Sequence, residues 1–193
     1  MDAGLAARAR RALGTRNLVL VGFMGTGKST LGRAVSRALA RPFADTDAEV
    51  VARAGRAIPA LFAAIGEAGF RDLEAAVVAD LGAAAGAVLA TGGGALGRAG
   101  NLEALRARGV LVALSARPEV ILSRVGGAEA ARRRPLLGGG DPLARIRYLL
   151  GERAAAYAQA DLHLDTSLLR RERAVVALLE LCAARAGAIR RGG

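Results

Sequence analysis

Short apolar runs alternate with segments of helical spacing along most of the chain. The first run, Asn17–Gly22, is continuous and apolar, which is typical of a strand buried on both faces. The segment from Lys28 to Ala40 has apolar residues at helical spacing and stops before Pro42. Further strands are predicted at 43–47, 87–90, 110–114 and 162–165, and further helices at 48–84 (with a break near 57–59), 100–108, 118–125, 143–159 and 170–186.

This alternation predicts an α/β fold in which a parallel sheet lies between two layers of helices. The 193 residues suit one domain, and no internal repeat or linker divides them. We expect the domain to span 17–186, with a disordered basic tail at 1–16 and a flexible tail at 187–193. Residues 126–141 are rich in Gly and Arg and contain Pro135, so a mobile loop is predicted there.

The composition limits the class of protein. Apolar residues make up 53% of the chain and aromatic residues 3%, so the core is expected to consist of Ala, Leu and Val. No uninterrupted apolar stretch approaches the length of about 20 residues that a membrane helix needs. The single cysteine, Cys182, lies in an apolar helical pattern and is interpreted as a small buried hydrophobe, in keeping with a reducing cytoplasm. The only histidine, His163, has no ligand partners nearby and is interpreted as a structural or surface residue.

The net charge of +11 raises the possibility of a nucleic-acid partner, but its distribution argues against one. Residues 1–16 and 182–193 together carry seven Arg and one Asp, so six of the eleven excess charges lie near the ends. No aromatic residues are interleaved with these charges for base stacking. The balance favours an enzyme with anionic substrates over a nucleic-acid-binding protein.

One motif carries a specific chemistry. Gly22-Phe-Met-Gly-Thr-Gly-Lys-Ser29 matches G-x-x-x-x-G-K-[ST] and lies between the first predicted strand and the first predicted helix. In such a loop the backbone N–H groups surround phosphate, the Lys reaches the β- and γ-phosphates, and the Ser hydroxyl binds Mg²⁺. The motif therefore predicts binding of ATP with Mg²⁺. The predicted nucleotide contacts here are Gly25, Thr26, Gly27, Lys28, Ser29 and Thr30.

Lys28 is the only lysine among the 28 basic residues, all the others being Arg. A lysine is a compact charge on a thin stem, so a position that retains it is interpreted as too narrow for a guanidinium. The third predicted strand ends in Thr91-Gly92-Gly93-Gly94 and has no carboxylate. Support for the metal is therefore expected from Asp45 or Asp47, and the glycines permit close approach of a ligand to the backbone.

Several further elements follow the P-loop. The chain carries, in order, Asp45-Thr46-Asp47, Gly66-Glu-Ala-Gly-Phe-Arg-Asp-Leu-Glu74, Thr91-Gly-Gly-Gly94, Arg134-Pro-Leu-Leu137, and Arg153 four residues before Tyr157. In order and approximate spacing these elements resemble the shikimate kinase family over residues 17 to about 167. The resemblance implies a P-loop three-layer sandwich with strand order 2-3-1-4-5 and a mobile lid over about 126–141. It also implies transfer of the γ-phosphoryl group of ATP to the 3-hydroxyl of shikimate.

The resemblance assigns roles around the acceptor. Arg71 and Arg153 would bind the carboxylate of the acceptor from opposite sides, and Asp47 would orient the reacting hydroxyl or accept its proton. Glu74 would hold Arg71 in place, and Asp45 would support Mg²⁺ through water. The resemblance also implies acceptor contacts at Phe70, Gly92, Gly93 and Gly94.

The resemblance extends to the lid and the adenine side of the nucleotide. Arg134 would reach the transferring phosphate when the lid closes, so it joins Lys28 and Asp47 as a predicted catalytic residue and nucleotide contact. Arg124 matches an arginine that stacks near adenine, and Asp165-Thr166-Ser167 resembles the adenine-side loop, although the residues after it depart from the family pattern. The neighbouring Arg132 and Arg133 are interpreted as solvated or as looser phosphate contacts.

Simpler interpretations exist for single elements. Taken alone, Arg71 and Glu74 are what any solvated helix face offers. Asp45 and Asp47 could cap the following helix, with Asp47 the better candidate. The ordered coincidence of the elements outweighs these interpretations. Residues 57–60, Ala-Ile-Pro-Ala, depart from the polar helix start of the family in the segment that would bind the acceptor.

Two alternative functions were weighed. One is a related kinase for another small hydroxy acid such as gluconate, against which Asp47, Arg71 and Arg153 together argue. The other is a non-catalytic regulator that senses ATP or a metabolite, against which intact Lys28, Asp47 and Arg134 argue. We expect a cytoplasmic monomer with a small-molecule substrate and without nucleic-acid or membrane partners.

Overall fold

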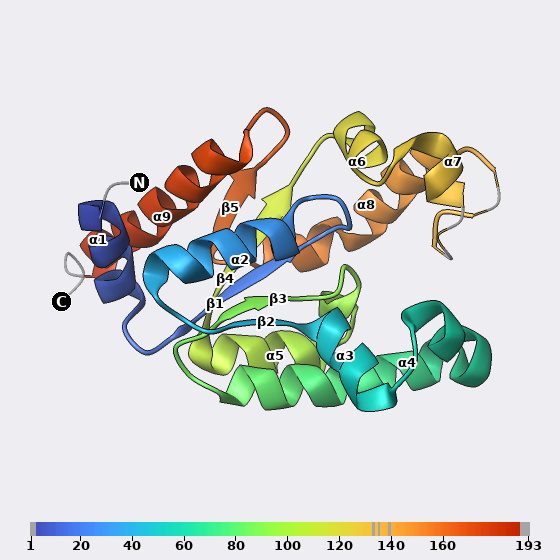
Figure 1. Ribbon diagram of the computed structural model, residues 1–193, viewed down its shortest axis with the longest axis horizontal. Helices are drawn as coiled ribbons and strands as arrows, with labels where there is room; N and C mark the ends of the chain where they lie inside the picture. Colours follow the sequence, from blue (N-terminus) through green and yellow to red (C-terminus); the bar gives the residue numbers. More distant parts are fainter. Residues whose placement is uncertain (1–2, 133, 135, 139, 190–193) are drawn as a thin grey trace.

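A parallel sheet forms the centre of the molecule in the computed structural model, which describes residues 3–132, 134, 136–138 and 140–189. Within these residues the sheet has five strands in the order β2-β3-β1-β4-β5 (Figure 1), and each neighbouring pair is parallel. The strands are β1 (Asn17–Gly22), β2 (Phe43–Asp45), β3 (Val88–Ala90), β4 (Gly109–Ser115) and β5 (Leu162–Asp165). The predicted fold class and strand order are confirmed.

Helices connect the strands and cover both faces of the sheet. They are α1 (Ala3–Leu13), α2 (Lys28–Leu39), α3 (Thr46–Ala54), α4 (Ile58–Ala83), α5 (Ala99–Arg108), α6 (Pro118–Arg124), α7 (Gly127–Arg132), α8 (Pro142–Ala158) and α9 (Arg171–Ile189), with a short 3-10 helix η1 (Ala95–Gly97). The predicted break near 57–59 lies between α3 and α4. A second interruption occurs inside α4, where Gly66 has a φ of 68°.

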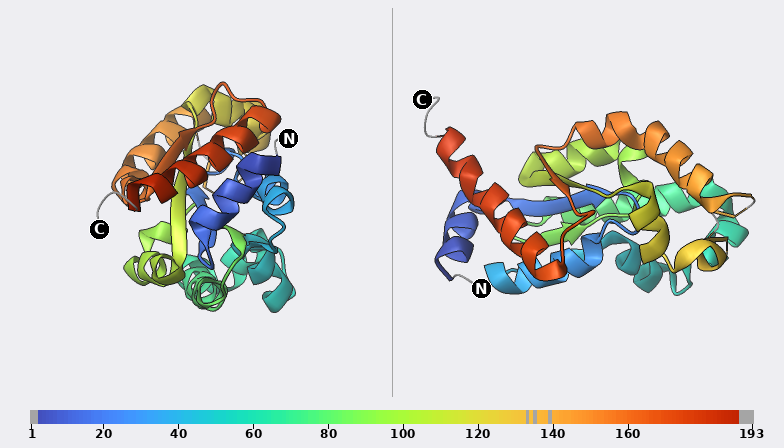
Figure 2. Two further views of the ribbon diagram at one scale, coloured as in Figure 1. Left: turned by 90° about the vertical axis from the view of Figure 1, so that its left-hand side faces the viewer. Right: turned by 90° about the horizontal axis from the view of Figure 1, so that it is seen from above.

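Two hydrophobic cores lie on opposite faces of the sheet. Leu18 and Leu20 of β1 pack with α1, α2 and α9, whereas Val19 and Val21 pack with α4, α5 and the end of α8. Successive side chains of a strand point to opposite faces, so the continuous apolar run supplies both cores. Figure 2 shows the sheet between these two helix layers.

The N-terminal segment is ordered, so the prediction of a disordered tail over 1–16 is wrong. Residues 3–13 form helix α1, which packs along α9 (Figure 2). Leu5, Ala9 and Leu13 recur every four residues and are all buried against α9. The arginines between them occupy the remaining faces, and their charge obscured this apolar stripe.

The other flanking predictions also change. Helix α9 extends through Ile189, so residues 187–189 are helical and not a flexible tail, while 190–193 lie outside the described residues. The segment 126–141 is not entirely loop, because it includes helix α7. Ala131 and Leu137 of this segment are buried and pack with Phe23. Its predicted mobility remains a prediction, and Pro135 lies outside the described residues.

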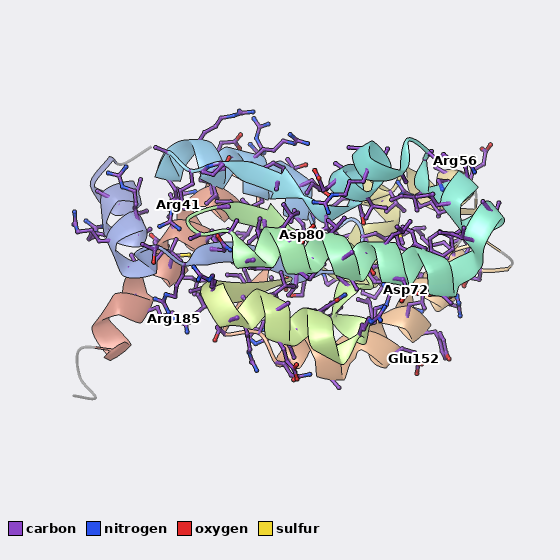
Figure 3. The ribbon with its side chains drawn as sticks, turned by 90° about the horizontal axis from the view of Figure 1, so that it is seen from below. Arg41, Arg56, Asp72, Asp80, Glu152 and Arg185 are labelled. Atoms are coloured by element: carbon purple, nitrogen blue, oxygen red, sulfur yellow. The ribbon has the colours of Figure 1, made fainter. Side chains whose placement is uncertain are left out.

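The outer surfaces are polar. Figure 3 shows charged side chains, among them Asp72, Asp80 and Glu152, on the solvent side of the helices that cover one face of the sheet. His163 is exposed on β5, whereas Cys182 is buried, as predicted. Across the described part of the chain, no helix combines the length and the apolar character that crossing a membrane requires.

The topology brings the chemical motifs together. The P-loop follows β1, Asp45 ends β2, and the glycine-rich segment 91–94 follows β3. Because parallel strands end at the same edge of the sheet, these three segments meet there. The site is built at this edge.

Candidate active site

The P-loop takes a conformation that its glycines make possible. Gly22 has a φ of 138°, and a Cβ added there would lie 2.2 Å from the carbonyl oxygen of Leu114. Gly25 and Gly27 also have positive φ, of 76° and 99°, a region that residues with a side chain rarely adopt. The chain can therefore turn sharply from β1 into α2 and direct the N-terminus of α2 toward a cavity.

Lys28 folds back over this loop. Its Nζ donates hydrogen bonds to the carbonyl oxygens of Gly22 at 2.8 Å and Phe23 at 2.9 Å. The residue is buried, and this burial lowers the pKa of Lys28 to about 8, against the opposing effect of Asp47 and Asp45. This enclosed position of the ammonium group agrees with the interpretation that the site of the only lysine is too narrow for a guanidinium.

Ser29 and Asp45 form an oxygen-rich pair beside the P-loop. The Ser29 hydroxyl donates to the Asp45 carboxylate at 2.6 Å. Among the described residues, no group of three or more His, Cys, Asp or Glu side chains is placed to hold a metal ion. A hydroxyl and one carboxylate nevertheless fit Mg²⁺, which keeps several waters and completes its coordination with substrate phosphates.

Asp45 also caps helix α3. Its carboxylate accepts from the backbone N–H groups of Asp47 and Ala48. The prediction that Asp47 is the better capping candidate is therefore wrong, because α3 begins at Thr46, two residues before the predicted start at 48. The consequence is that the Asp47 carboxylate is free to line the site.

Two cavities meet at Asp47. The P-loop cavity has a volume of about 610 Å³, and its lining includes every predicted nucleotide contact except Arg134. The second cavity, called the glycine-loop cavity after the loop of residues 91–94, has a volume of about 320 Å³. Its lining includes every predicted acceptor contact together with Arg134. Both cavities are lined by Met24, Asp47 and Gly93. Burial raises the pKa of Asp47 to about 6, with Asp45 and Glu74 adding to the effect.

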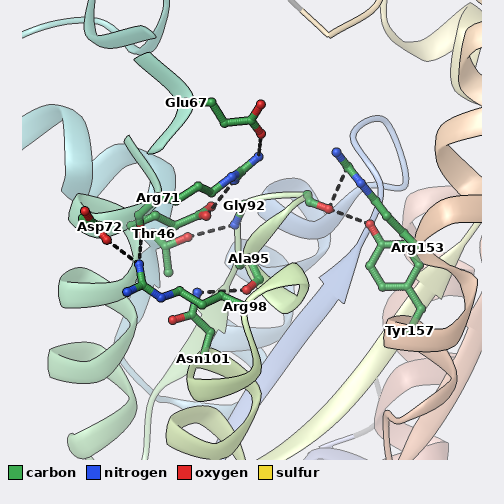
Figure 4. Close-up of polar contacts among 12 residues, drawn as sticks. Thr46, Glu67, Arg71, Asp72, Gly92, Ala95, Arg98, Asn101, Arg153 and Tyr157 are labelled. Carbon is green, nitrogen blue, oxygen red and sulfur yellow. Dashed lines mark hydrogen bonds and ion pairs between the residues drawn. The ribbon is translucent and has the colours of Figure 1, made fainter. Parts of the chain in front are cut away.

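Two arginines face the glycine-loop cavity from opposite sides. Arg71 projects from α4 and Arg153 from α8 (Figure 4). Arg71 donates to Glu74 at 2.7 Å and to Glu67 at 3.1 Å. Glu74 is 1% exposed, so the pair is not an ordinary solvated helix face. The buried carboxylate holds one cation at the cavity wall.

The glycine loop, residues 91–94, is fixed by three side chains from two helices, α3 and α8 (Figure 4). Thr46 Oγ1 accepts from the Gly92 N–H at 2.8 Å. The Gly93 carbonyl accepts from Arg153 Nη1 at 2.9 Å and from the Tyr157 hydroxyl at 2.7 Å. Sequence reasoning assigned no role to Thr46 or Tyr157, and the only available signal was the spacing of Tyr157 one helical turn after Arg153.

At two positions of this loop an added side chain would displace groups of the site. A Cβ on Gly92 would lie 2.4 Å from Glu74 Oε1 and 2.7 Å from Asp47 Oδ1. A Cβ on Gly94 would lie 2.7 Å from the Arg71 guanidinium. These distances are far below any normal contact, so the absence of side chains here allows the cavity groups to approach the backbone.

Apolar residues complete the glycine-loop cavity. Phe70 is buried, and its ring lies 4.6 Å from the ring of Phe62, centroid to centroid. Ile58 and Pro59, from the segment that departs from the family pattern, also line the cavity. The departure therefore adds apolar wall and removes none of the predicted acceptor contacts.

Arg124 and Thr166 also line the P-loop cavity. Arg124 donates to the Thr166 hydroxyl oxygen at 2.9 Å and to the Thr166 carbonyl oxygen at 2.6 Å. The Thr166 hydroxyl in turn lies 3.0 Å from the carbonyl oxygen of Thr26 and donates to it. This contact ties the segment after β5 to the P-loop. Arg133 and the side chain of Arg132 lie outside what the structure describes.

Comparisons with known proteins agree with this geometry. A sequence model of the family described as shikimate kinase matches residues 24–183. The chain is 51% identical over 144 residues to a shikimate kinase of Symbiobacterium thermophilum, covering 75% of this chain and 82% of that protein. It is 48% identical over 153 residues to a shikimate kinase of Desulforudis audaxviator, covering 79% of each.

A solved structure gives the same answer. The shikimate kinase from Acinetobacter baumannii in complex with shikimate superposes with a TM-score of 0.84 at 35% identity, covering 91% of this chain and 97% of that chain. The family match begins within the P-loop, at residue 24, and includes Arg71 and Arg153. The fold, the two cavities and these similarities together establish that the chain belongs to the shikimate kinase family.

Proposed function

We propose that this member of the shikimate kinase family transfers the γ-phosphoryl group of ATP to the 3-hydroxyl of shikimate. The observation that carries the proposal is the position of Asp47, which lines both the P-loop cavity and the glycine-loop cavity. A carboxylate at this junction lies between a phosphate-binding loop and a cavity lined by three arginines. That is where a reacting hydroxyl has to meet a transferring phosphoryl group.

The P-loop binds the phosphates of ATP in this proposal. The backbone N–H groups at the start of α2 point toward the anion. The Lys28 ammonium, which here donates to the carbonyl oxygens of Gly22 and Phe23, donates to the β- and γ-phosphates when ATP is bound. Arg124 and Thr166 line the same cavity, where the adenine is accommodated.

Ser29 and Asp45 would hold Mg²⁺, which when bound would supply positive charge beside the β- and γ-phosphates. Asp45 is kept in position by the N–H groups at the start of α3, so its carboxylate can face Ser29 without rearrangement of the helix.

The glycine-loop cavity binds the acceptor. Arg71 and Arg153 bind its carboxylate from two sides, and Glu74 keeps Arg71 against the cavity wall. Asp47 orients the 3-hydroxyl toward the γ-phosphate and accepts its proton, a role for which a pKa raised to about 6 is suited at neutral pH. The exposed Arg134 lines this cavity, and we propose that it reaches the transferring phosphate when residues 126–141 close as a lid.

All these groups come from one chain, so we propose that a monomer is sufficient for activity. The proposed setting is the cytoplasm, where ATP is available and the buried Cys182 thiol stays reduced. Light scattering of the purified protein, combined with activity measured across protein concentrations, tests the monomer.

A coupled assay of ADP release with MgATP tests the function. We expect strong release that depends on shikimate and is lost in the Asp47→Asn variant. Release that is independent of shikimate would overturn the acceptor assignment. Gluconate is the matched comparison, because stimulation by gluconate and not by shikimate would favour the related hydroxy-acid kinase.

A further inference from the structure

Tyr157 contacts the same atom as Arg153. Both side chains project from α8, one helical turn apart, and both donate to the carbonyl oxygen of Gly93, at 2.7 Å and 2.9 Å respectively. Gly93 lines the P-loop cavity and the glycine-loop cavity, whereas Tyr157 lines neither. The phenol therefore reaches the site through this carbonyl and through the neighbouring side chain of Arg153 (Figure 4).

The Gly93 carbonyl determines how Arg153 is presented. A guanidinium has five N–H donors in a rigid fork, and Arg153 uses Nη1 on Gly93. Its guanidinium also lies 5.2 Å from the centroid of the Phe23 ring. With Nη1 on the Gly93 carbonyl and Cζ over an aromatic ring, the guanidinium is held at the wall of the cavity that it lines.

From this geometry we infer that Tyr157 is a positioning residue for the acceptor carboxylate, acting through Gly93 and Arg153. This inference rests on the proposed function. The phenol holds the Gly93 carbonyl in one orientation, and that carbonyl holds Arg153. Pre-organised donors bind a carboxylate without first having to be ordered, so loss of the phenol hydroxyl weakens acceptor binding.

Two tyrosine substitutions can distinguish this positioning role from a purely structural one. The Tyr157 ring packs against the core that contains Val19 and Val21 and against the apolar cluster around Phe23, and Tyr157→Phe retains this packing. The Gly93 carbonyl also keeps Arg153 as a donor in that variant, so it is not left without a partner. The matched control is Tyr148→Phe, which removes the hydroxyl of a tyrosine on the same helix that is 56% exposed.

Steady-state kinetics with MgATP and shikimate test the inference. The unmodified protein is assayed first, because failure to phosphorylate shikimate there refutes the proposed function and not the role of Tyr157. In Tyr157→Phe we expect KM for shikimate to rise about fivefold, with kcat and KM for ATP changed less than about twofold. Tyr148→Phe should match the unmodified protein. An unchanged KM for shikimate in Tyr157→Phe would overturn the inference.

A double-mutant cycle tests the route through Arg153. In an Arg153→Ala background, Tyr157→Phe should have no further effect on KM for shikimate, because the group it positions is gone. Additive effects would overturn the route. If Tyr157→Phe lowered kcat, raised both KM values to a similar degree and lowered Tm, the residue would have a structural role and not the proposed positioning role.

Fluorine NMR gives a readout that does not depend on how the Tyr157 variants fold. Tyr148 and Tyr157 are the only tyrosines, so 3-fluorotyrosine incorporated into Tyr148→Phe labels Tyr157 alone. Shikimate should shift this resonance, and the shift should vanish in Arg153→Ala at saturating shikimate. A fluorine chemical shift of Tyr157 that does not change on addition of shikimate would contradict the inference.

Discussion

Arg71 donates a hydrogen bond of 2.7 Å to Glu74, whose side chain is 1% exposed. A second carboxylate, Glu67, lies 3.1 Å from the same guanidinium but is 63% exposed. The two contacts differ in energetic weight, because a buried carboxylate that loses its cation is costly whereas an exposed pair contributes little. Glu74 therefore determines where Arg71 lies.

Glu74→Gln removes the charge with little change of shape. We expect KM for shikimate to rise about tenfold, equivalent to about 1.4 kcal/mol, because Arg71 is no longer held at the cavity wall. Glu67→Gln is the control and should change KM less than about twofold. Steady-state kinetics at saturating ATP measure both, and equal effects of the two substitutions would contradict the prediction.

Asp47→Asn should act on turnover and not on nucleotide binding. Loss of the group that accepts the proton is expected to lower kcat by about 10²- to 10⁴-fold, while ADP binding measured by calorimetry stays within about threefold. Asp45→Asn provides the contrast. It should raise the Mg²⁺ concentration needed for half-maximal rate, because the carboxylate beside Ser29 is lost. If Asp47→Asn kept a tenth of the activity or more, the proposed role of Asp47 would be wrong.

The pH dependence follows from two buried groups. Asp47, whose pKa is raised to about 6 chiefly by burial, has to be ionised to accept a proton, so activity falls as pH drops through that value. Lys28, whose pKa is lowered to about 8 chiefly by burial, has to be protonated to bind phosphate, so activity falls as pH rises through that value. The profile of kcat/KM for ATP should be bell-shaped with these limbs. A flat profile from about pH 5 to about pH 9, with circular dichroism unchanged, would refute it.

Gly92→Ala should disrupt the site by steric overlap. The new Cβ would lie 2.4 Å from Glu74 Oε1 and 2.7 Å from Asp47 Oδ1, so at least one carboxylate has to move. We expect kcat/KM for shikimate to fall by at least about 100-fold. Gly97→Ala is the matched control in η1, where a Cβ meets no atom within 4 Å, and it should behave as the unmodified protein. Comparable losses in both variants would indicate that the backbone, and not the overlap, is responsible.

Helix α1 should contribute to stability. Leu13 is 2% exposed and packs in the same core as α9, so Leu13→Ala is expected to lower the free energy of unfolding by about 2–5 kcal/mol. Arg11→Ala, at an exposed position of the same helix, should change it by less than about 0.5 kcal/mol. Urea denaturation measures both. A Leu13→Ala variant as stable as Arg11→Ala would mean that α1 does not stabilise the folded state.

The sequence predicts most reliably the elements whose residue pattern lies within one short stretch of the chain. The central strands β1, β3 and β4 are short, largely apolar runs, and Asn17–Gly22 is buried at every position because it serves both cores. The P-loop follows from its own eight residues. The acceptor residues were identified through resemblance, because nothing local distinguishes Arg71 or Arg153 from other arginines, and the structure brings them to one cavity.

The predictions that failed depended on contacts distant in sequence. The stripe formed by Leu5, Ala9 and Leu13 is meaningful only once α9 lies against it. Thr46 and Tyr157 serve the site by binding backbone groups of the glycine loop, 46 and 64 residues away in the chain. Such partners are backbone atoms that any residue offers, so side-chain patterns do not point to them.

The only lysine in the chain lies inside the P-loop cavity. A covalent reagent directed at side-chain amines consequently has one target, and that target is the ammonium proposed to bind ATP. Its pKa of about 8 leaves a much larger uncharged, reactive fraction near neutrality than an ordinary lysine has. The extent of Lys28 acylation therefore reports how much of the protein is free of nucleotide. Protection at increasing nucleotide concentration gives the affinity for the nucleotide without any measurement of turnover.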